Sequence, residues 1–100
     1  MREEVFGPVL AVQVADDDEH AVALANGTDD GLVAGLYSRD VSRALRVADG
    51  IDAGSITIND YWAGGVAVPF GGRRKSGYGR EKGREGLDAS LVAKAITIRV

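Results

Sequence analysis

Residues 32–59 read LVAGLYSRDVSRALRVADGIDAGSITIN, and this stretch decides the fold class. Residues 32–38 form a short, mostly apolar run that is typical of a buried strand. Asp40 precedes residues 41–49, whose apolar side chains recur at helical spacing, so we expect a capped helix with one core-facing stripe. Residues 55–59, SITIN, alternate apolar and polar side chains as a strand does. A strand, a helix and a strand of these lengths predict a parallel βαβ unit.

The same pattern extends toward the N-terminus. Residues 9–14, VLAVQV, predict a further buried strand, and the four acids at residues 16–19 mark the start of a helix that an Asn-Gly pair ends. We therefore expect an α/β protein with a βαβαβ parallel sheet. Farther along, residues 80–90 predict a short third helix, and residues 95–100, AITIRV, alternate as a last strand.

The composition narrows the class of protein. The chain has 100 residues, of which 45% are hydrophobic and 27% charged, and this suits one marginally stable globular domain. It has no cysteine and one histidine, which exclude disulfides, thiolate chemistry and histidine clusters, so we expect no metal site. No apolar run approaches the roughly 20 residues of a membrane span. Residues 1–10 lack the features of a secretory signal, so we expect a cytoplasmic protein without a membrane partner.

Charge is distributed unevenly along the chain. Residues 1–70 carry 12 acidic and 4 basic side chains, whereas residues 71–84 carry six basic side chains and Glu81 as their one acid. A basic, glycine-rich stretch is typical either of a solvated loop leading into a helix or of a site that meets phosphates or RNA. We favour the loop, and expect no nucleic-acid partner, because Tyr78 is the one aromatic side chain in this stretch that could stack on a base.

Two further segments are candidates for a functional site. Residues 61–78 are rich in glycine and without periodicity, and an irregular stretch of this length is usually functional. Glu3 and Glu4 precede Phe6 at a glycine-proline turn. A carboxylate there could accept hydrogen bonds from a ribose diol, and a ring could pack on a nicotinamide. From the residues alone, an acidic lead into a strand with a core phenylalanine explains the same pattern.

Four stretches occur here in an order that resembles the C-terminal part of the NAD(P)-dependent aldehyde dehydrogenase superfamily. They are EEVFGPVL (residues 3–10), ALANGTDDGLVAGLYSRD (23–40), RALRVADGIDAGSITIND (43–60) and PFGGRRKSGYGREKG (69–83). The resemblance covers nearly the whole chain. It implies that residues 1–90 are the end of a catalytic domain and that residues 91–100 are an oligomerisation strand.

The resemblance implies an activity for the full enzyme, which is the oxidation of an aldehyde to a carboxylic acid with NAD or NADP. In that family a cysteine thiolate attacks the carbonyl carbon, a hydride passes to the nicotinamide, and an activated water hydrolyses the thioester. The chain contains no cysteine. The resemblance therefore places the nucleophile, the general base and the adenine-binding segment in sequence before Met1, and we expect this chain alone to be inactive with aldehydes.

The resemblance also assigns cofactor contacts by position. Glu4 is expected to hold the hydroxyl groups of the nicotinamide ribose, and Phe6 and Leu32 are expected to lie beside the nicotinamide. The pair Arg73-Arg74 stands where the family commonly has an aromatic residue or a lysine. We expect this difference to alter surface charge only.

The substrate side of the site is assigned in the same way. Phe70 is expected to wall the aldehyde tunnel, and Trp62, in the variable loop before Pro69, is a candidate pocket residue. Glu81 matches a carboxylate that relays protons toward the hydrolytic water, so it is the candidate catalytic residue on this chain. Asn59 is expected to fix the loop that follows it. If these assignments hold, the cofactor and substrate residues should surround one hollow.

Two other interpretations remain open at this stage. Residues 91–100 could make the chain a non-catalytic assembly module, because an unpaired apolar strand near a chain end favours pairing with another chain and a homo-oligomer. A basic-loop nucleic-acid binder rests on composition alone, and the acidic balance of residues 1–70 opposes it.

Overall fold

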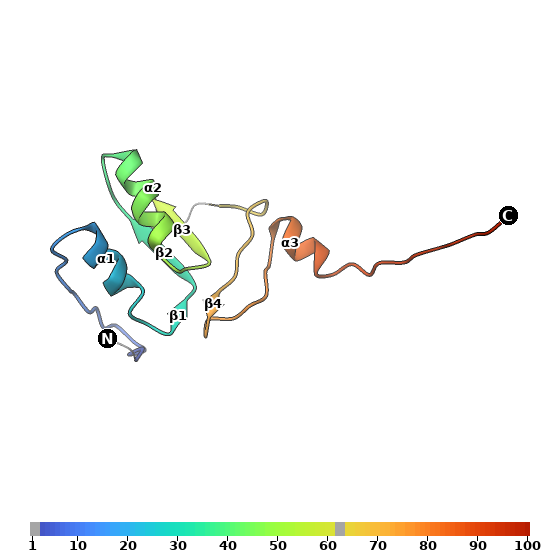
Figure 1. Cartoon of the computed structure of the whole chain (residues 1–100). Helices are drawn as coiled ribbons and strands as arrows, with labels where there is room; N and C mark the ends of the chain where they lie inside the picture. Colours follow the sequence, from blue (N-terminus) through green and yellow to red (C-terminus); the bar gives the residue numbers. More distant parts are fainter. Residues whose placement is uncertain (1–2, 62–63) are drawn as a thin grey trace.

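The computed structural model describes residues 3–61 and 64–100, and in this part of the chain it contains three helices and two small sheets (Figure 1). The elements in chain order are α1 (Asp18–Ala25), β1 (Asp30–Gly31), β2 (Val33–Leu36), α2 (Val41–Gly50), β3 (Ser55–Ile58), β4 (Arg73–Arg74) and α3 (Gly83–Asp88). The predicted α/β class is confirmed.

The central βαβ unit forms as residues 32–59 predict. β2 and β3 pair in parallel, with Val33 opposite Ser55 and Leu36 opposite Ile58, and α2 is the connection between them. The Asp40 side chain caps α2 by accepting a hydrogen bond from the backbone N–H of Arg43 at 3.0 Å. Parallel pairing requires a crossover connection, which α2 supplies.

The stripe on α2 is covered only in part. Ala44 is 1% exposed and is the one buried hydrophobic residue of the described chain, whereas Val41 and Leu45 remain 61% and 58% exposed. No described segment packs over the outer half of this stripe, so the predicted core exists only where α2 meets its immediate neighbours.

α1 begins and ends close to where the sequence predicts. The Asp17 side chain caps its first turn by accepting a hydrogen bond from the backbone N–H of His20 at 2.7 Å, and Asn26 is the C-cap. Arg43 on α2 forms an ion pair with Asp18 on α1, with 2.6 Å between Nη2 and Oδ1. This pair ties the two helices together at their exposed edges.

Two predicted strands do not form. Residues 9–14 and 95–100 belong to no ladder in the described structure, and their side chains are exposed: Leu10 is 87% exposed and Ile98 80%. The parallel sheet therefore has two strands rather than three. A strand requires a neighbour that accepts and donates its backbone hydrogen bonds, and neither stretch has a described ladder partner. Figure 1 shows residues 91–100 projecting from the body of the molecule.

The antiparallel pair β1–β4 was not predicted. Asp30 lies opposite Arg74 and Gly31 opposite Arg73, so the basic, glycine-rich segment is joined to the turn that precedes β2. Two-residue strands leave no readable alternation in a sequence, since the alternation that marks a strand needs at least four residues.

The chain exposes far more surface than a self-contained domain of its size. Its accessible surface is 8506 Å², whereas a compact monomer of this mass exposes about 5,400 Å². Its radius of gyration is 18.1 Å, against about 13 Å for a compact domain of this length. Within the described ranges no helix is long and apolar enough to cross a membrane, and no group of three or more His, Cys, Asp and Glu side chains gathers as a metal site would.

Candidate functional site

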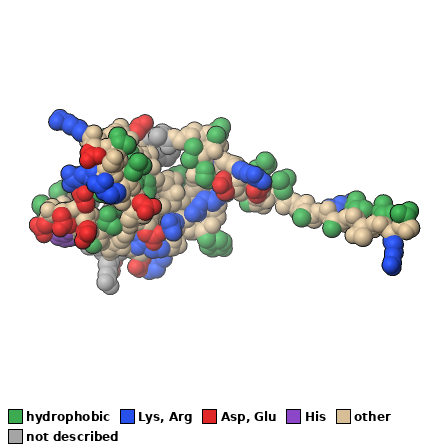
Figure 2. Space-filling view, turned by 45° about the horizontal axis from the view of Figure 1, so that its top comes forward, with side chains coloured by type: hydrophobic (Ala, Val, Ile, Leu, Met, Phe, Trp, Pro, Cys, Tyr) green, Lys and Arg blue, Asp and Glu red, His purple; other side chains and the backbone are tan. Residues whose placement is uncertain are grey.

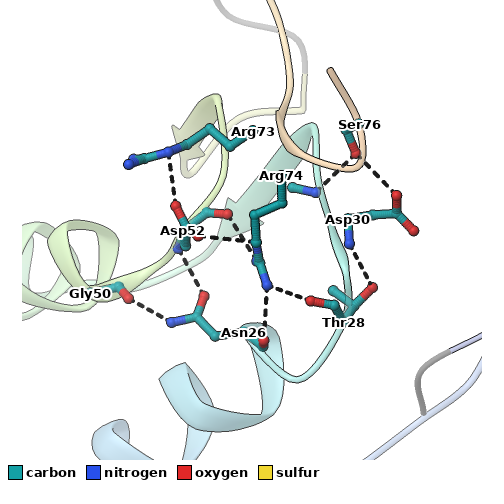
Figure 3. Close-up of polar contacts among 9 residues, drawn as sticks. Asn26, Thr28, Asp30, Gly50, Asp52, Arg73, Arg74 and Ser76 are labelled. Atoms are coloured by element: carbon teal, nitrogen blue, oxygen red, sulfur yellow. Dashed lines mark hydrogen bonds and ion pairs between the residues drawn. The ribbon is translucent and has the colours of Figure 1, made fainter. Parts of the chain in front are cut away.

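The guanidinium of Arg74 joins the turn after α1 to the turn after α2 by donating to three backbone carbonyls (Figure 3). Its Nη1 donates to the carbonyl oxygens of Asn26, at 3.1 Å, and of Thr28. Its Nη2 donates to the carbonyl of Asp52 at 3.0 Å, and its Nε forms an ion pair with the Asp52 carboxylate at 3.0 Å. The Arg74 side chain is 29% exposed. The expectation that this arginine alters surface charge only is therefore wrong. We call its contacts with Asn26, Thr28 and Asp52 the Arg74 clasp.

Two further side chains complete this clasp. The Asn26 amide donates to the carbonyl of Gly50 and accepts from the backbone N–H of Asp52, both at 2.8 Å. The second carboxylate oxygen of Asp52 pairs with Arg73 Nε at 2.8 Å (Figure 3). The end of α1, the turn after α2 and β4 are thereby joined through polar groups rather than through a hydrophobic core.

Glycine allows the same segments to approach closely. A Cβ atom on Gly54 would fall on the backbone carbonyl of Gly71, and one on Gly72 would fall on the backbone of Ser76. The glycine-rich segment therefore lies directly against the start of β3. This contact aligns the stretch from Phe70 onward with the parallel sheet.

The Phe70 hollow is a cavity of about 250 Å³ between the sheet and the segment that follows β3. Residues that line it include Val33, Tyr61, Val68, Phe70 and Lys82. One wall is fixed by an isolated bridge in which Phe70 N–H donates to the Glu81 carbonyl at 2.8 Å and Glu81 N–H donates to the Phe70 carbonyl at 2.7 Å.

The Glu4 hollow is a second, more open cavity of about 490 Å³. Glu3, Glu4, Leu32 and Arg74 are among its lining residues. Val33 of β2 lines both this hollow and the Phe70 hollow.

The structure brings some of the predicted site residues together and leaves others apart. Glu4 and Leu32 share one hollow and Phe70 lines the other, whereas Glu81 is bonded to the Phe70 backbone and lines neither hollow. Phe6 is 94% exposed and lines neither hollow, because residues 3–14 run along the surface without a ladder partner. The described part of the chain has these residues at two hollows that share Val33. Trp62 lies outside the described residues.

The side-chain amide of Asn59, just after β3, hydrogen-bonds to the backbone of Ser38, just after β2. Its Oδ1 accepts from the backbone N–H of Ser38 and its Nδ2 donates to the Ser38 carbonyl, both at 2.8 Å. Its φ of 57° lies in the left-handed region, which asparagine tolerates better than most residues. These contacts tie the end of β3 to the end of β2 where the segment after β3 begins.

Most cations of the basic stretch are bound to the chain itself. Lys75 Nζ lies 2.6 Å from Asp29 Oδ2, and this hydrogen bond raises the pKa of the lysine. Arg80 donates to the carbonyls of Gly72 and Gly79 at 2.7 and 2.8 Å. With Arg73 and Arg74 already held by Asp52, these contacts favour the loop interpretation of residues 71–84 over a nucleic-acid site.

The two hollows offer recognition groups but no thiol. Glu4, whose carboxylate is a hydrogen-bond acceptor, lines one hollow with the apolar Leu32, and Phe6 stands apart from both. The chain has no cysteine to act as a nucleophile. Arg74 and Lys82 were missed as site residues because their relevance depends on contacts between segments far apart in sequence.

Comparison with known proteins matches nearly the whole chain to one family. The model of the aldehyde dehydrogenase family matches residues 1–96. The chain is 46% identical over 97 residues to betaine aldehyde dehydrogenase 2 of Rhizobium meliloti, and 41% identical over 100 residues to 4-trimethylaminobutyraldehyde dehydrogenase A of Danio rerio. These matches cover 97% and 100% of this chain and 20% of each relative, so the chain spans about a fifth of their length.

The fold agrees with a solved structure as well. The crystal structure of betaine aldehyde dehydrogenase from Staphylococcus aureus in complex with NAD⁺ matches with a TM-score of 0.87 and 42% sequence identity. That match covers 93% of this chain and 18% of the other. Sequence and fold therefore agree that the chain belongs to the aldehyde dehydrogenase family.

Proposed function

We propose that the chain forms the C-terminal portion of an NAD(P)-dependent aldehyde dehydrogenase that oxidises an aldehyde to a carboxylic acid. The observation that carries the proposal is that the chain matches one fifth of such enzymes along nearly all of its own length. Its unusually large exposed surface supports the proposal, because a piece of a larger domain exposes the surface that the rest of the domain would cover.

In this proposal the Glu4 hollow faces the cofactor. Glu4 accepts hydrogen bonds from the hydroxyls of the nicotinamide ribose, and Leu32 packs beside the nicotinamide. Phe6 joins them if the neighbouring part of the enzyme folds residues 3–14 back toward the hollow. When bound, the cofactor, NAD or NADP, supplies the acceptor for the hydride that leaves the aldehyde carbon. The NAD⁺ complex of the Staphylococcus aureus relative supports this assignment.

The Phe70 hollow then forms one wall of the aldehyde site. Phe70 and the apolar side chains of the hollow exclude water from the reacting aldehyde, with Trp62 as a further pocket residue. Glu81 relays protons toward the hydrolytic water, from a position that its backbone bridge to Phe70 supports. The cysteine nucleophile comes from residues other than these 100.

Activity measurements on two proteins test the proposal. The first is the 100-residue chain alone, which should give no NADH from an aldehyde and NAD⁺, because it has no thiol to form the thiohemiacetal. The second is a chimera in which the 97 aligned residues replace the matching segment of the Rhizobium meliloti relative. The chimera should oxidise a simple aldehyde such as pentanal. Turnover by the isolated chain, or an inactive chimera that is folded, would contradict the proposal.

A second candidate function is assembly, and the projecting C-terminal segment favours it. Residues 91–100 are extended and carry exposed apolar side chains, among them Val92 at 95% and Ile96 at 76% (Figure 2). An extended apolar segment of this kind can add to the sheet edge of another chain and so form a homo-oligomer. Removal of residues 97–100 from the chimera should lower its mass in light scattering, and an unchanged mass would count against this role.

A cytoplasmic location of the whole protein is part of the same proposal. Subcellular fractionation of the tagged full-length protein tests it, and recovery in a membrane or secreted fraction would contradict it.

A further inference from the structure

The Phe70 hollow has one feature that the proposed function does not use. Lys82 lines the hollow and places its Nζ atom 5.4 Å from the centre of the Phe70 ring. At this distance an ammonium is attracted to the negative face of an aromatic ring. The other lining residues of the described chain are apolar or uncharged, and include Val33, Ile56 and Val68.

Backbone contacts on both sides keep Lys82 at the hollow. Glu81, the preceding residue, is paired with Phe70, and the N–H of Gly83, the following residue, donates to the carbonyl of Val66 at 3.0 Å. Lys82 itself has a φ of 59°, in the left-handed region that a lysine rarely adopts. Such a conformation persists where the surrounding contacts determine it. Backbone contacts therefore fix where the exposed Lys82 side chain leaves the chain, beside the hollow that its ammonium lines.

The charge of Lys82 is not neutralised inside the hollow. Among residues 3–61 and 64–100 no carboxylate forms an ion pair with it, although Glu81 and Glu85 are close in sequence. No acidic residue of the described chain lines the hollow. An anion that enters the hollow is therefore attracted to Lys82, whereas a cation is repelled and meets a ring that already binds an ammonium.

We infer that Lys82 determines substrate specificity: the site favours aldehydes with a carboxylate at the end remote from the aldehyde group over aldehydes with a trimethylammonium group. The inference rests on the proposed function, because it takes the Phe70 hollow as a wall of the aldehyde site. It separates this chain from the relatives named after betaine aldehyde and 4-trimethylaminobutyraldehyde, both of which are cationic substrates.

Steady-state kinetics of the chimera test this specificity with three aldehydes of similar length. They are succinate semialdehyde, which is anionic, pentanal, which is neutral, and 4-trimethylaminobutyraldehyde, which is cationic. Lys82→Met keeps an unbranched side chain and removes the charge. It should lower the ratio of kcat/KM for the anionic over the cationic aldehyde by about tenfold or more, and change kcat/KM for the neutral pentanal by less than it changes this ratio. Lys82→Glu should lower the ratio further.

The control is Arg84→Gln, which removes a cation two residues along the chain. Arg84 pairs with Asp88 at 3.5 Å on exposed α3 and does not line the hollow, so the ratio should stay as in the parent. If pentanal is still oxidised but the ratio of kcat/KM for the anionic over the cationic aldehyde is the same in the parent and in both Lys82 variants, the inference is overturned and the proposed function is not. Loss of pentanal oxidation in the folded parent chimera would instead contradict the proposed function.

A binding measurement on the 100-residue chain keeps the inference testable if the chimera is inactive. Butyrate and choline serve as anionic and cationic probes, and NMR follows the Lys82 side-chain methylene next to Nζ and the Phe70 ring. Butyrate should shift both signals in a saturable way, and Lys82→Met should abolish the effect. Equal shifts with choline, or none with butyrate, would overturn the inference.

Discussion

Phe70 and Glu81 are joined through their backbones, each N–H donating to the carbonyl of the other at 2.8 and 2.7 Å. They are eleven positions apart, and the segment between them contains β4 and the Arg74 clasp. The side chains take no part in the bridge. The aromatic wall and the carboxylate can therefore be altered one at a time while the backbone that presents both of them stays in place.

This relationship leads to a prediction for Glu81 in the chimera. Glu81→Gln keeps the backbone bridge but removes the group proposed to relay a proton. It should lower kcat by about 10²-fold, in the range of lost general acid–base catalysis, and change KM little. Glu85→Gln, an exposed acid on α3, is the matched control and should retain parental turnover. An unchanged kcat for Glu81→Gln would remove Glu81 from the mechanism.

The Arg74 clasp predicts a difference between two neighbouring arginines. Arg74→Ala leaves the carbonyls of Asn26, Thr28 and Asp52 without their donor, and should destabilise these turns by about 2–3 kcal/mol. Arg73→Ala removes one half-exposed ion pair and should cost less than about 1 kcal/mol.

Amide hydrogen exchange in the chimera measures both changes locally. The N–H groups of Gly31 and Asp52 should lose about 30- to 100-fold of their protection in Arg74→Ala and little in Arg73→Ala. Arg74→Lys should fall between the two, because an ammonium keeps the charge but lacks the planar fork that reaches several carbonyls. Equal protection in the two alanine variants would show that the clasp contributes nothing.

Close backbone packing predicts the effect of a single methyl group. Gly54→Ala places a Cβ on the carbonyl of Gly71, which is backbone and gives way only if the glycine-rich segment moves off β3. The cost should be about 2–4 kcal/mol, seen as a lower thermal unfolding midpoint of the chimera. Gly79→Ala meets nothing within 4 Å and should be nearly neutral. Equal midpoints for the two variants would refute the close contact.

The ion pair between α1 and α2 predicts an acid-dependent change in stability. The hydrogen bond from Arg43 lowers the pKa of Asp18 from its usual value of 3.8. A carboxyl whose pKa is lower in the folded state stabilises the fold at pH values above its unfolded pKa, and this contribution is lost as the pH falls through the folded pKa. Its size should be small, because both side chains are exposed and screened by solvent.

Thermal unfolding of the chimera at two pH values checks this dependence. Asp18→Asn should have a lower midpoint than the parent at pH 7, and the difference should shrink as the pH falls below about 4. Asp49→Asn, which alters an exposed carboxylate near the end of α2, controls for the loss of a charge. A difference between Asp18→Asn and the parent that is constant with pH would exclude the ion pair as its cause.

Elements whose stabilising groups lie close together in the chain could be predicted from the residues. Asp17 and Asp40 cap their helices through bonds spanning three residues, and α2 with its two flanking strands follows from apolar spacing within residues 32–59. The family could also be recognised from the sequence, since EEVFGPVL and PFGGRRKSGYGREKG are linear motifs.

The pairing of segments that lie far apart in the chain could not be predicted in this way. Residues 9–14 and 95–100 read as strands but lie unpaired, because a strand forms only where a neighbour completes its hydrogen bonds. Arg74 reaches Asn26 and Thr28 across 48 and 46 positions of sequence, and no local pattern records such a contact. The Phe70–Glu81 bridge and the ammonium of Lys82 over the Phe70 ring are decided in the same way, by the packing of the glycine-rich segment on the sheet.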